Sequence, residues 1–246
     1  MKWLVVFLCL ATAAWADRPP ITQAVGLDEH LDGQLPLSAP FVDETGRRVT
    51  LGSFFGTQPV VLVFAWYECP GLCSEVQNGV VQCITDQPLV PGKDFQVVTI
   101  SINPKDTPEL AAERKRLTVS RYGSGGEGFH YLTGDARAVA TAAGFRYVYD
   151  AKTQQYGHPA GIMVCTPQGR LARYLYGVRY SSRDLKFALE EASHGRIGSP
   201  AIRLALLCFQ YDPSTGKYGL AIMRILRVSG AMTFLSLGLF AWRHRG

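Results

Sequence analysis

The sequence predicts an α/β domain: a mixed central sheet with flanking helices and an N-terminal hairpin, followed by a C-terminal transmembrane helix. Residues 60–65 form a continuous apolar run, which is typical of a strand buried on both faces of a parallel sheet, and residues 95–102 predict a second buried strand. Segments with helical spacing of apolar residues alternate with these strands, which indicates helices packed on the sheet. Turn residues at 44–46 and 167–169 predict antiparallel pairs, which make the sheet mixed.

The composition is that of a folded protein with one large domain or two small ones. The 246 residues are 47% hydrophobic and 18% charged, which is too apolar for a disordered chain. Six cysteines are too sparse for a disulfide scaffold. The net charge of +5 forms no Lys/Arg run in the middle of the chain, so we expect no nucleic-acid partner.

Residues 1–16 have the features of a secretory signal peptide. Lys2 gives the positive start, an apolar stretch follows, and the small-x-small pattern at 14–16 fits a cleavage site. The alternative, an uncleaved N-terminal anchor, would need a longer apolar stretch. Cleavage would remove Cys9 and leave five cysteines in a compartment where disulfides form, so not all of them can pair within one chain.

A second apolar stretch lies near the C-terminus. Residues 228–242 carry no charge but number only 15, against about 20 needed to span a bilayer. Extension back to residue 218 adds length and includes Arg224 and Arg227, whose long side chains can reach the headgroups. We expect residues 218–242 to form a transmembrane anchor; a buried or surface-lying helix is the alternative. With the signal peptide, this predicts anchoring in the inner membrane with the domain on the periplasmic side.

The first half of the domain has four expected elements. Residues 41–55 predict a hairpin around the 44–46 turn, and the strand at 60–65 follows. Residues 74–85 have apolar side chains at helical spacing, which predicts a helix packed on the sheet. The second buried strand, at 95–102, comes next.

The second half begins with a helix that Thr107 caps, with Pro108 in its first turn and Gly123 at its end. Asp135 predicts the cap of a short helix that ends at Gly144. Antiparallel strands follow on either side of the 167–169 turn, at residues 160–165 and 171–176. A last helix is capped by Ser181, and its buried stripe is formed by Leu185, Ala188, Leu189 and Ala192.

This order of elements fits a thioredoxin-like fold over residues 41–195. Residues 17–40 are rich in Pro and Gly and predict an extended arm. Residues 196–217 predict a connector between the domain and the anchor, and they include Cys208, for which an intermolecular disulfide is one option.

The pair Cys69 and Cys73 follows directly after the strand at 60–65 and opens the next helix. Sites of parallel sheets form at the carboxyl ends of strands, and a spacing of four lets both sulfurs face one side of a first helical turn. A helix N-terminus favours the thiolate. Such a pair can form a disulfide, exchange it with another protein or clamp a soft metal. The alternative is two ordinary buried cysteines, the role we expect for Cys165.

His158 is the one histidine that a thioredoxin-like fold brings toward this motif. It lies just before the strand at 160–165, in a loop that this fold sets beside the cysteine loop. Cys83 lies ten residues beyond Cys73 on the same helix, too far along to share the site.

The chain resembles the SCO/SenC family of copper proteins that assist assembly of cytochrome c oxidase, over about residues 35–195. The segments that carry the resemblance are FVDETGRRVTLGSFFG, VVLVFAWYECPGLC, VVTISINPKDTPE, and His158 before GIMVCTPQGRL. The resemblance implies a membrane-tethered metallochaperone, not an enzyme in the strict sense. It implies copper, as Cu(I) or Cu(II), bound by Cys69, Cys73 and His158. The implied partners are the oxidase subunit with the copper site, an upstream copper donor or thiol reductant, and membrane lipid.

The chain departs from the family pattern at several positions. Many members have Pro where this chain has Ser74, and Asp and Ser where it has Gly157 and Pro159. Many also have the tripeptide Val-Asp-Pro where this chain has Ile-Asn-Pro, with Asn103 in place of the Asp. Each ligand is retained, so the departures concern the hydrogen bonds around the ligands, which tune affinity and redox behaviour. The C-terminal anchor also differs from the N-terminal tether expected of the family.

The chemistry of these ligands leaves other functions open. Thiolates select Cu(I) and imidazole suits both copper states, but zinc with two Cys and one His is possible as well. A thiol–disulfide oxidoreductase that uses Cys69 and Cys73 is the second hypothesis, and a redox-sensing interaction module is the third. Only the copper hypothesis needs His158. A disulfide between the two cysteines would block copper loading, because metal binding needs reduced, deprotonated thiols.

Overall fold

The computed structural model describes residues 24–69, 71–123 and 126–198, with the short pieces 211–212, 217–218 and residue 233. The predicted signal peptide, Cys9, Cys208 and nearly all of the predicted anchor lie outside these residues. Within the part of the chain that is described, no helix is long and apolar enough to cross a bilayer.

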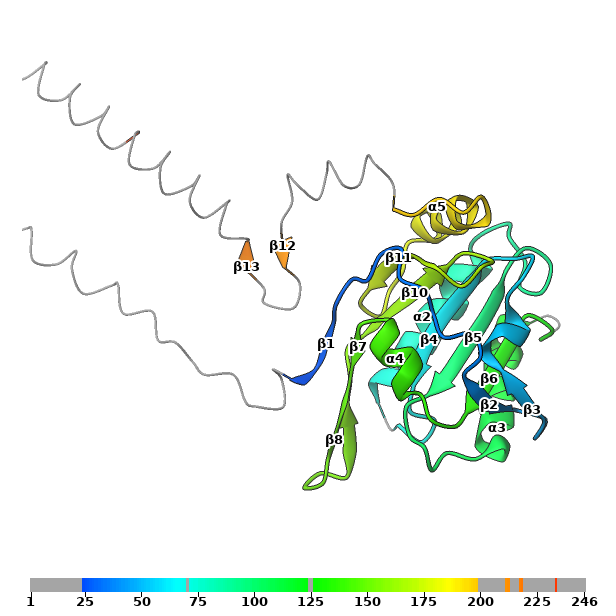
Figure 1. Cartoon of the computed structure of the whole chain (residues 1–246), viewed down its shortest axis with the longest axis vertical. Helices are drawn as coiled ribbons and strands as arrows, with labels where there is room; N and C mark the ends of the chain where they lie inside the picture. The colour runs from blue at the N-terminus through cyan, green and yellow to red at the C-terminus, as the bar shows by residue number, and fades with distance from the viewer. Residues whose placement is uncertain are drawn as a thin grey trace, which may run out of the picture. The chain divides into compact units, whose positions relative to one another are not determined.

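The chain divides into two units, Met1–Gly195 and Arg196–Gly246. In the second unit, the described residues form one antiparallel pair, β12 (Tyr211–Asp212) with β13 (Lys217–Tyr218). The first unit holds the domain (Figure 1).

A seven-stranded mixed sheet forms the centre of the domain, in the order β11-β10-β4-β5-β6-β2-β3. The strands are β2 (Pro40–Asp43), β3 (Arg48–Thr50), β4 (Val60–Ala65), β5 (Gln96–Ser101), β6 (Phe129–Thr133), β10 (Gly161–Cys165) and β11 (Leu171–Tyr176). Strands β4, β5 and β6 are parallel, while β10, β11, β2 and β3 pair antiparallel. The mixed α/β, thioredoxin-like fold that the sequence predicts is therefore confirmed.

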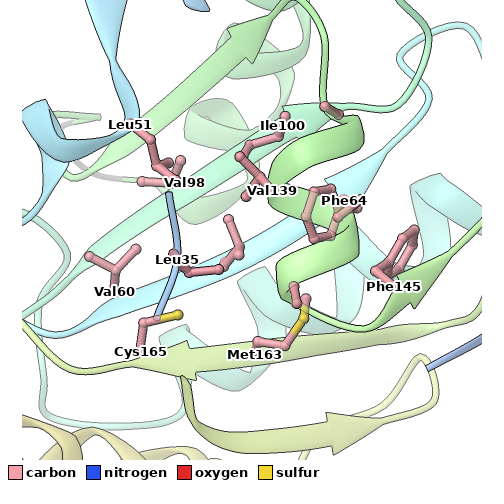
Figure 2. Close-up of a cluster of buried hydrophobic side chains, with 14 of the residues drawn as sticks. Leu35, Leu51, Val60, Phe64, Val98, Ile100, Val139, Phe145, Met163 and Cys165 are labelled. Atoms are coloured by element: carbon pink, nitrogen blue, oxygen red, sulfur yellow. The ribbon is translucent and has the colours of Figure 1, made fainter. Parts of the chain in front are cut away.

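Strand β4 is buried on both faces, as its continuous apolar sequence predicts. All six of its residues are buried. Because side chains alternate along a strand, Leu62 and Phe64 both belong to one apolar cluster on the same face. Figure 2 shows Phe64 in this cluster with Val98, Ile100 and Met163 of the neighbouring strands. The alternate side chains of β4 point to the other face of the sheet, where Val63 lies near residues of two helices, Val80 and Thr118.

Helices cover both faces of the sheet. Helix α2 (Leu72–Thr85) contacts α3 (Pro108–Tyr122) and α5 (Ser182–Ser193), and these three form one layer. Helix α4 (Arg137–Ala142) supplies Val139 and Ala140 to the cluster on the other face. Figure 1 shows α4 on the side of the sheet away from α2 and α3.

The predicted helix ends are confirmed in α3 and α5. Thr107 Oγ1 accepts the N–H of Leu110 at 3.4 Å, and Gly123 ends α3 with a φ of 82°. Ser181 Oγ accepts the N–H of Asp184 at 3.3 Å at the start of α5.

The start of α4 differs from the prediction. The N-cap residue of α4 is Ala136, which has no side chain to accept a hydrogen bond. Asp135 stands one residue earlier and accepts the N–H of Arg137 at 3.0 Å. Its carboxylate also forms an ion pair with the Arg137 guanidinium at 2.6 Å.

Four strand pairings were not predicted, and β6 makes two of them, with β5 and with β2. Strand β6 begins directly after a glycine-rich loop and carries polar residues, which hides its apolar pattern. Strands β8 (Val148–Asp150) and β9 (Gln155–Gly157) form a polar hairpin that projects from the sheet (Figure 1). Strand β1 (Gly26–Leu27) pairs with β7 (Phe145–Arg146), so this part of the N-terminal segment is held on the domain.

Candidate metal centre

Cys69 lies in a tight turn between β4 and α2. Its backbone N–H donates to the carbonyl of Trp66 at 3.1 Å, and the residue is half-buried. Helix α2 begins at Leu72, with Gly71 as the N-cap residue. Cys69 therefore precedes the helix and Cys73 lies in its first turn, which corrects the prediction that both belong to one helical turn. The side chain of Cys73 lies outside what the structure describes.

His158 lies between β9 and β10, at the same edge of the sheet as Cys69. Strand β10 runs antiparallel to β4, with Ile162 opposite Val63. The start of β10 is therefore next to the end of β4. His158 stands three residues before β10 and Cys69 four residues after β4, so both loops leave the sheet at this edge.

Aromatic rings pack the two loops against the domain. The His158 ring stacks on Phe145 with centroids 6.0 Å apart, and Phe145 contacts Phe64 of β4 at 4.6 Å. Figure 2 shows Phe64 and Phe145 in the same apolar cluster. On the cysteine side, Trp66 meets Tyr156 of β9 edge-on at 5.7 Å. These contacts fix the approach of each loop to the sheet edge.

The His158 imidazole is held in a form that suits metal binding. Burial lowers the pKa of His158, although the hydrogen bond with Pro159 acts in the opposite direction. Nδ1 lies 3.0 Å from the Pro159 carbonyl oxygen, which can only accept, so the proton belongs on Nδ1. Nε2 is then the atom that carries the lone pair, and a neutral imidazole is the form that ligates metals.

Among the residues that the structure describes, no three His, Cys, Asp or Glu side chains gather as a metal-ligand group. The described residues do not include the side chain of Cys73, which is one of the implied ligands. The two loops nevertheless offer a thiol and an imidazole at one sheet edge, with the second motif cysteine in the adjoining helical turn. Sulfur and imidazole nitrogen are the donors that suit copper, so the residues present fit this metal.

The sequence did not reveal a buried polar network beneath the cysteine turn. The Asp106 carboxylate accepts hydrogen bonds from the Tyr67 N–H at 2.9 Å, the Ser101 hydroxyl at 2.6 Å and the Asn103 amide at 2.7 Å. Asp106 is 6% exposed and Asn103 is 7% exposed. The run of turn residues at 103–108 is the signal that could have drawn attention to them, because it follows the end of β5 at this same edge.

The remaining candidates take other roles. Cys165 is fully buried in β10, which confirms the prediction that it is a core residue, and burial raises the pKa of its thiol. Burial likewise raises the pKa of Cys83 to about 11. His130 lies near the start of β6, at the opposite edge of the sheet from Cys69, where burial lowers its pKa to about 4.

A thioredoxin-like domain with two cysteines between a buried strand and the next helix, and a histidine on the neighbouring loop, belongs to the class of domains that handle thiols or soft metals. The sequence matches the SCO1/SenC family over residues 33–191, and the chain belongs to this family. No curated protein sequence matches it.

Several solved structures are similar to this chain, and those with a TM-score above 0.5 share its fold. A candidate electron transfer protein of Aquifex aeolicus VF5 is 25% identical, with a TM-score of 0.59 over 68% of this chain and 95% of that one. A SCO1/SenC family lipoprotein of Bacillus anthracis str. Ames is 15% identical, with a TM-score of 0.54 over 68% of this chain and 99% of that one. ScoI of Arabidopsis thaliana, solved with copper bound, is 18% identical, with a TM-score of 0.49 over 65% of this chain and 99% of that one.

Proposed function

We propose that this chain is an exported, membrane-anchored copper chaperone that binds copper through Cys69, Cys73 and His158 and helps to assemble the copper site of cytochrome c oxidase. The observation that carries the proposal is the convergence of the cysteine turn and the His158 loop at one edge of the sheet. Membership of the SCO1/SenC family supports the same function.

The chemistry of the donors supports copper as the cargo. Two thiolates are soft ligands that favour Cu(I), and Nε2 of His158 adds a ligand that suits both oxidation states. Cys69 is half-buried, so a partner's ligand can reach a metal bound there. Copper would pass on by exchange of these ligands for those of the recipient. The recipient in this proposal is the oxidase subunit that carries the copper site.

The proposed placement in the cell depends on the two ends of the chain. Residues 1–16 would be removed as a signal peptide and residues 218–242 would anchor the protein in the inner membrane. The domain of residues 41–195 would then face the periplasm, flanked by the arm at 17–40 and the connector at 196–217. A copper donor or a thiol reductant would act upstream on the same side.

The test is copper binding by the purified full chain, reduced and kept free of oxygen. We expect one tightly bound Cu(I) per chain. Removal of a ligand in Cys69→Ser, Cys73→Ser or His158→Ala should weaken binding by more than the roughly 10–100-fold that loss of a surrounding hydrogen bond costs. Affinity is measured by competition with a chromophoric Cu(I) chelator.

Two control variants remove the same kinds of side chain elsewhere. His194→Ala changes an exposed histidine beyond α5, and Cys83→Ala changes a thiol in the core. Both should bind copper as the unchanged chain does. A reduced chain without tight copper would overturn the proposal. Copper that survives His158→Ala would overturn the assignment of the histidine.

A thiol–disulfide oxidoreductase is the second candidate, favoured by the position of Cys73 in the first turn of α2, where a helix N-terminus favours the thiolate. In this function the Cys69–Cys73 pair would reduce cysteines of an oxidase subunit or of another exported protein. His158→Ala separates the two candidates, because it should abolish tight copper binding and leave dithiol exchange intact.

A further inference from the structure

The two loops that carry the proposed ligands are joined beneath the sheet edge by buried side chains of the β5–α3 connection. We propose that Asn103 and Asp106 are positioning residues that hold the Cys69 turn and the β9 strand before His158 at a fixed separation. The inference rests on the proposed function for its ligand, Cu(I), and on the hydrogen bonds of these two side chains for its geometry.

Asp106 fixes the cysteine turn through the backbone. Its Oδ2 accepts the N–H of Tyr67 at 2.9 Å, two residues before Cys69. The same oxygen accepts the Ser101 hydroxyl at 2.6 Å. Because Asp106 is only 6% exposed, water replaces these bonds poorly, and loss of the acceptor would leave buried donors unsatisfied. The turn is therefore anchored to the end of β5.

Asn103 extends the connection to the histidine side. Its Nδ2 donates to Asp106 Oδ1 at 2.7 Å, while its Oδ1 accepts the Lys105 N–H at 3.1 Å and the Tyr156 hydroxyl at 3.3 Å. Tyr156 lies in β9, two residues before His158, and its ring meets Trp66 of the cysteine loop. A chain of direct contacts therefore runs from one ligand loop to the other.

A neutral amide at position 103 matches this geometry. One end of the Asn103 side chain donates to a carboxylate while the other accepts, and an amide offers both without carrying a charge. A carboxyl group in its place would lie beside the Asp106 carboxylate, where two like charges repel and the ionised form of one of them is disfavoured. Asn103, which stands where many family members have Asp, therefore gives the Asp106 carboxylate a neutral hydrogen-bond donor.

The test measures Cu(I) affinity of the full chain by chelator competition. Asn103→Asp should weaken binding by about 10-fold or more, within the range typical of lost hydrogen bonds around a metal site. The double variant Asn103→Asp/Asp106→Asn exchanges amide and carboxylate and restores a donor–acceptor pair, so it should recover affinity to within about 3-fold.

The control Gln58→Glu makes the same amide-to-acid change at the opposite edge of the sheet. Gln58 Nε2 donates to the Gly92 and Lys93 carbonyls and its Oε1 accepts from Gln96, so this change also breaks hydrogen bonds that one amide makes at both ends. Its copper affinity should not change. Tyr156→Phe removes only the hydroxyl that meets Asn103 and serves if Asn103→Asp fails to fold; Tyr149→Phe is its exposed control.

A second readout needs no copper and separates failure of this inference from failure of the proposed function. In the metal-free chain, Asn103→Asp should speed hydrogen exchange of the Tyr67 amide and shift the Cys69–Cys73 dithiol–disulfide equilibrium in glutathione buffers, with recovery in the exchanged pair. If the unchanged chain binds no copper but these shifts occur, the copper function is wrong and the positioning role stands. A folded Asn103→Asp chain with unchanged affinity, exchange and equilibrium would overturn the inference.

Discussion

Asp43 shows how a single buried side chain organises a turn. Its carboxylate, 2% exposed, accepts hydrogen bonds from the Thr45 N–H and hydroxyl and from the Arg47 N–H and guanidinium, at 2.6 to 3.0 Å. Burial alone would raise the pKa of Asp43, but these hydrogen bonds outweigh it and lower the pKa to about 2. The ionised form is thus the form that the β2–β3 turn needs.

A pH dependence of stability follows from Asp43. Because its folded-state pKa lies below the ordinary value of 3.8, its contribution is present above about pH 4 and is lost as the pH falls toward 2. Asp43→Asn should lower the free energy of unfolding by about 1–2 kcal/mol at pH 7 and by much less near pH 2. Urea unfolding at both pH values measures the difference. An equal loss at both would show that charge plays no part.

At the residue scale, the candidate metal ligands could be predicted from the sequence, but the hydrogen bonds that hold their loops could not. Cys69 and Cys73 could be found because their spacing and their place after a buried strand are local features. The role of Asp106 could not, because its partner Tyr67 is brought to it by the pairing of β4 with β5. The turn residues around Asp106 mark a loop, but they carry no signal for this long-range contact.

In helix α2, the segment that packs on the helix determines which residue can stand at position 79. Gly79 lies in the middle of this helix, where a glycine costs about 1 kcal/mol relative to alanine. A Cβ atom at Gly79 would come within 1.9 Å of the Val178 carbonyl oxygen, in the segment before α5. Close approach of this segment to α2 therefore requires the glycine.

Gly79→Ala is expected to destabilise the domain although it improves helix propensity. The new methyl group would overlap the Val178 carbonyl oxygen, a backbone atom that cannot change rotamer to avoid it. Either the helix or the segment around Val178 must therefore shift, at a cost of about 1–3 kcal/mol in the free energy of unfolding. The measurement is the midpoint of urea unfolding. A stabilised variant would mean that α2 and the Val178 segment are not in close contact in solution.

At the element scale, strong apolar patterns were predictable and polar ones were not. Strand β4 has a continuous apolar sequence, helix α5 has a periodic apolar stripe, and helix α3 has recognisable residues at both ends. Strands β8 and β9 lack such signals, since the hairpin projects from the sheet, and its two strands meet through the rings of Tyr149 and Tyr156. The exposed hairpin has no core-facing stripe to reveal it, and it is the element that leads into His158.

The molecule as a whole couples the proposed site to its own stability. The Cys69 turn joins β4 to α2 and His158 precedes β10, so a metal held by these loops would cross-link the centre of the sheet. An unfolded chain cannot keep these ligands together, so copper should bind chiefly the folded state. Binding energy then adds to the free energy of unfolding.

Reduced full-length protein with free Cu(I) at about 100 times the dissociation constant should gain about 2.7 kcal/mol, which corresponds to a rise of roughly 5–10 °C in melting temperature. After oxidation of Cys69 and Cys73 to a disulfide, the same Cu(I) should raise the melting temperature little, because both thiolates are consumed. Calorimetry of the two redox forms, with Cys69→Ser as the control, makes the comparison. An equal rise in melting temperature in both forms would mean that copper binds elsewhere on the chain. Copper binding would then not depend on the redox state of Cys69 and Cys73.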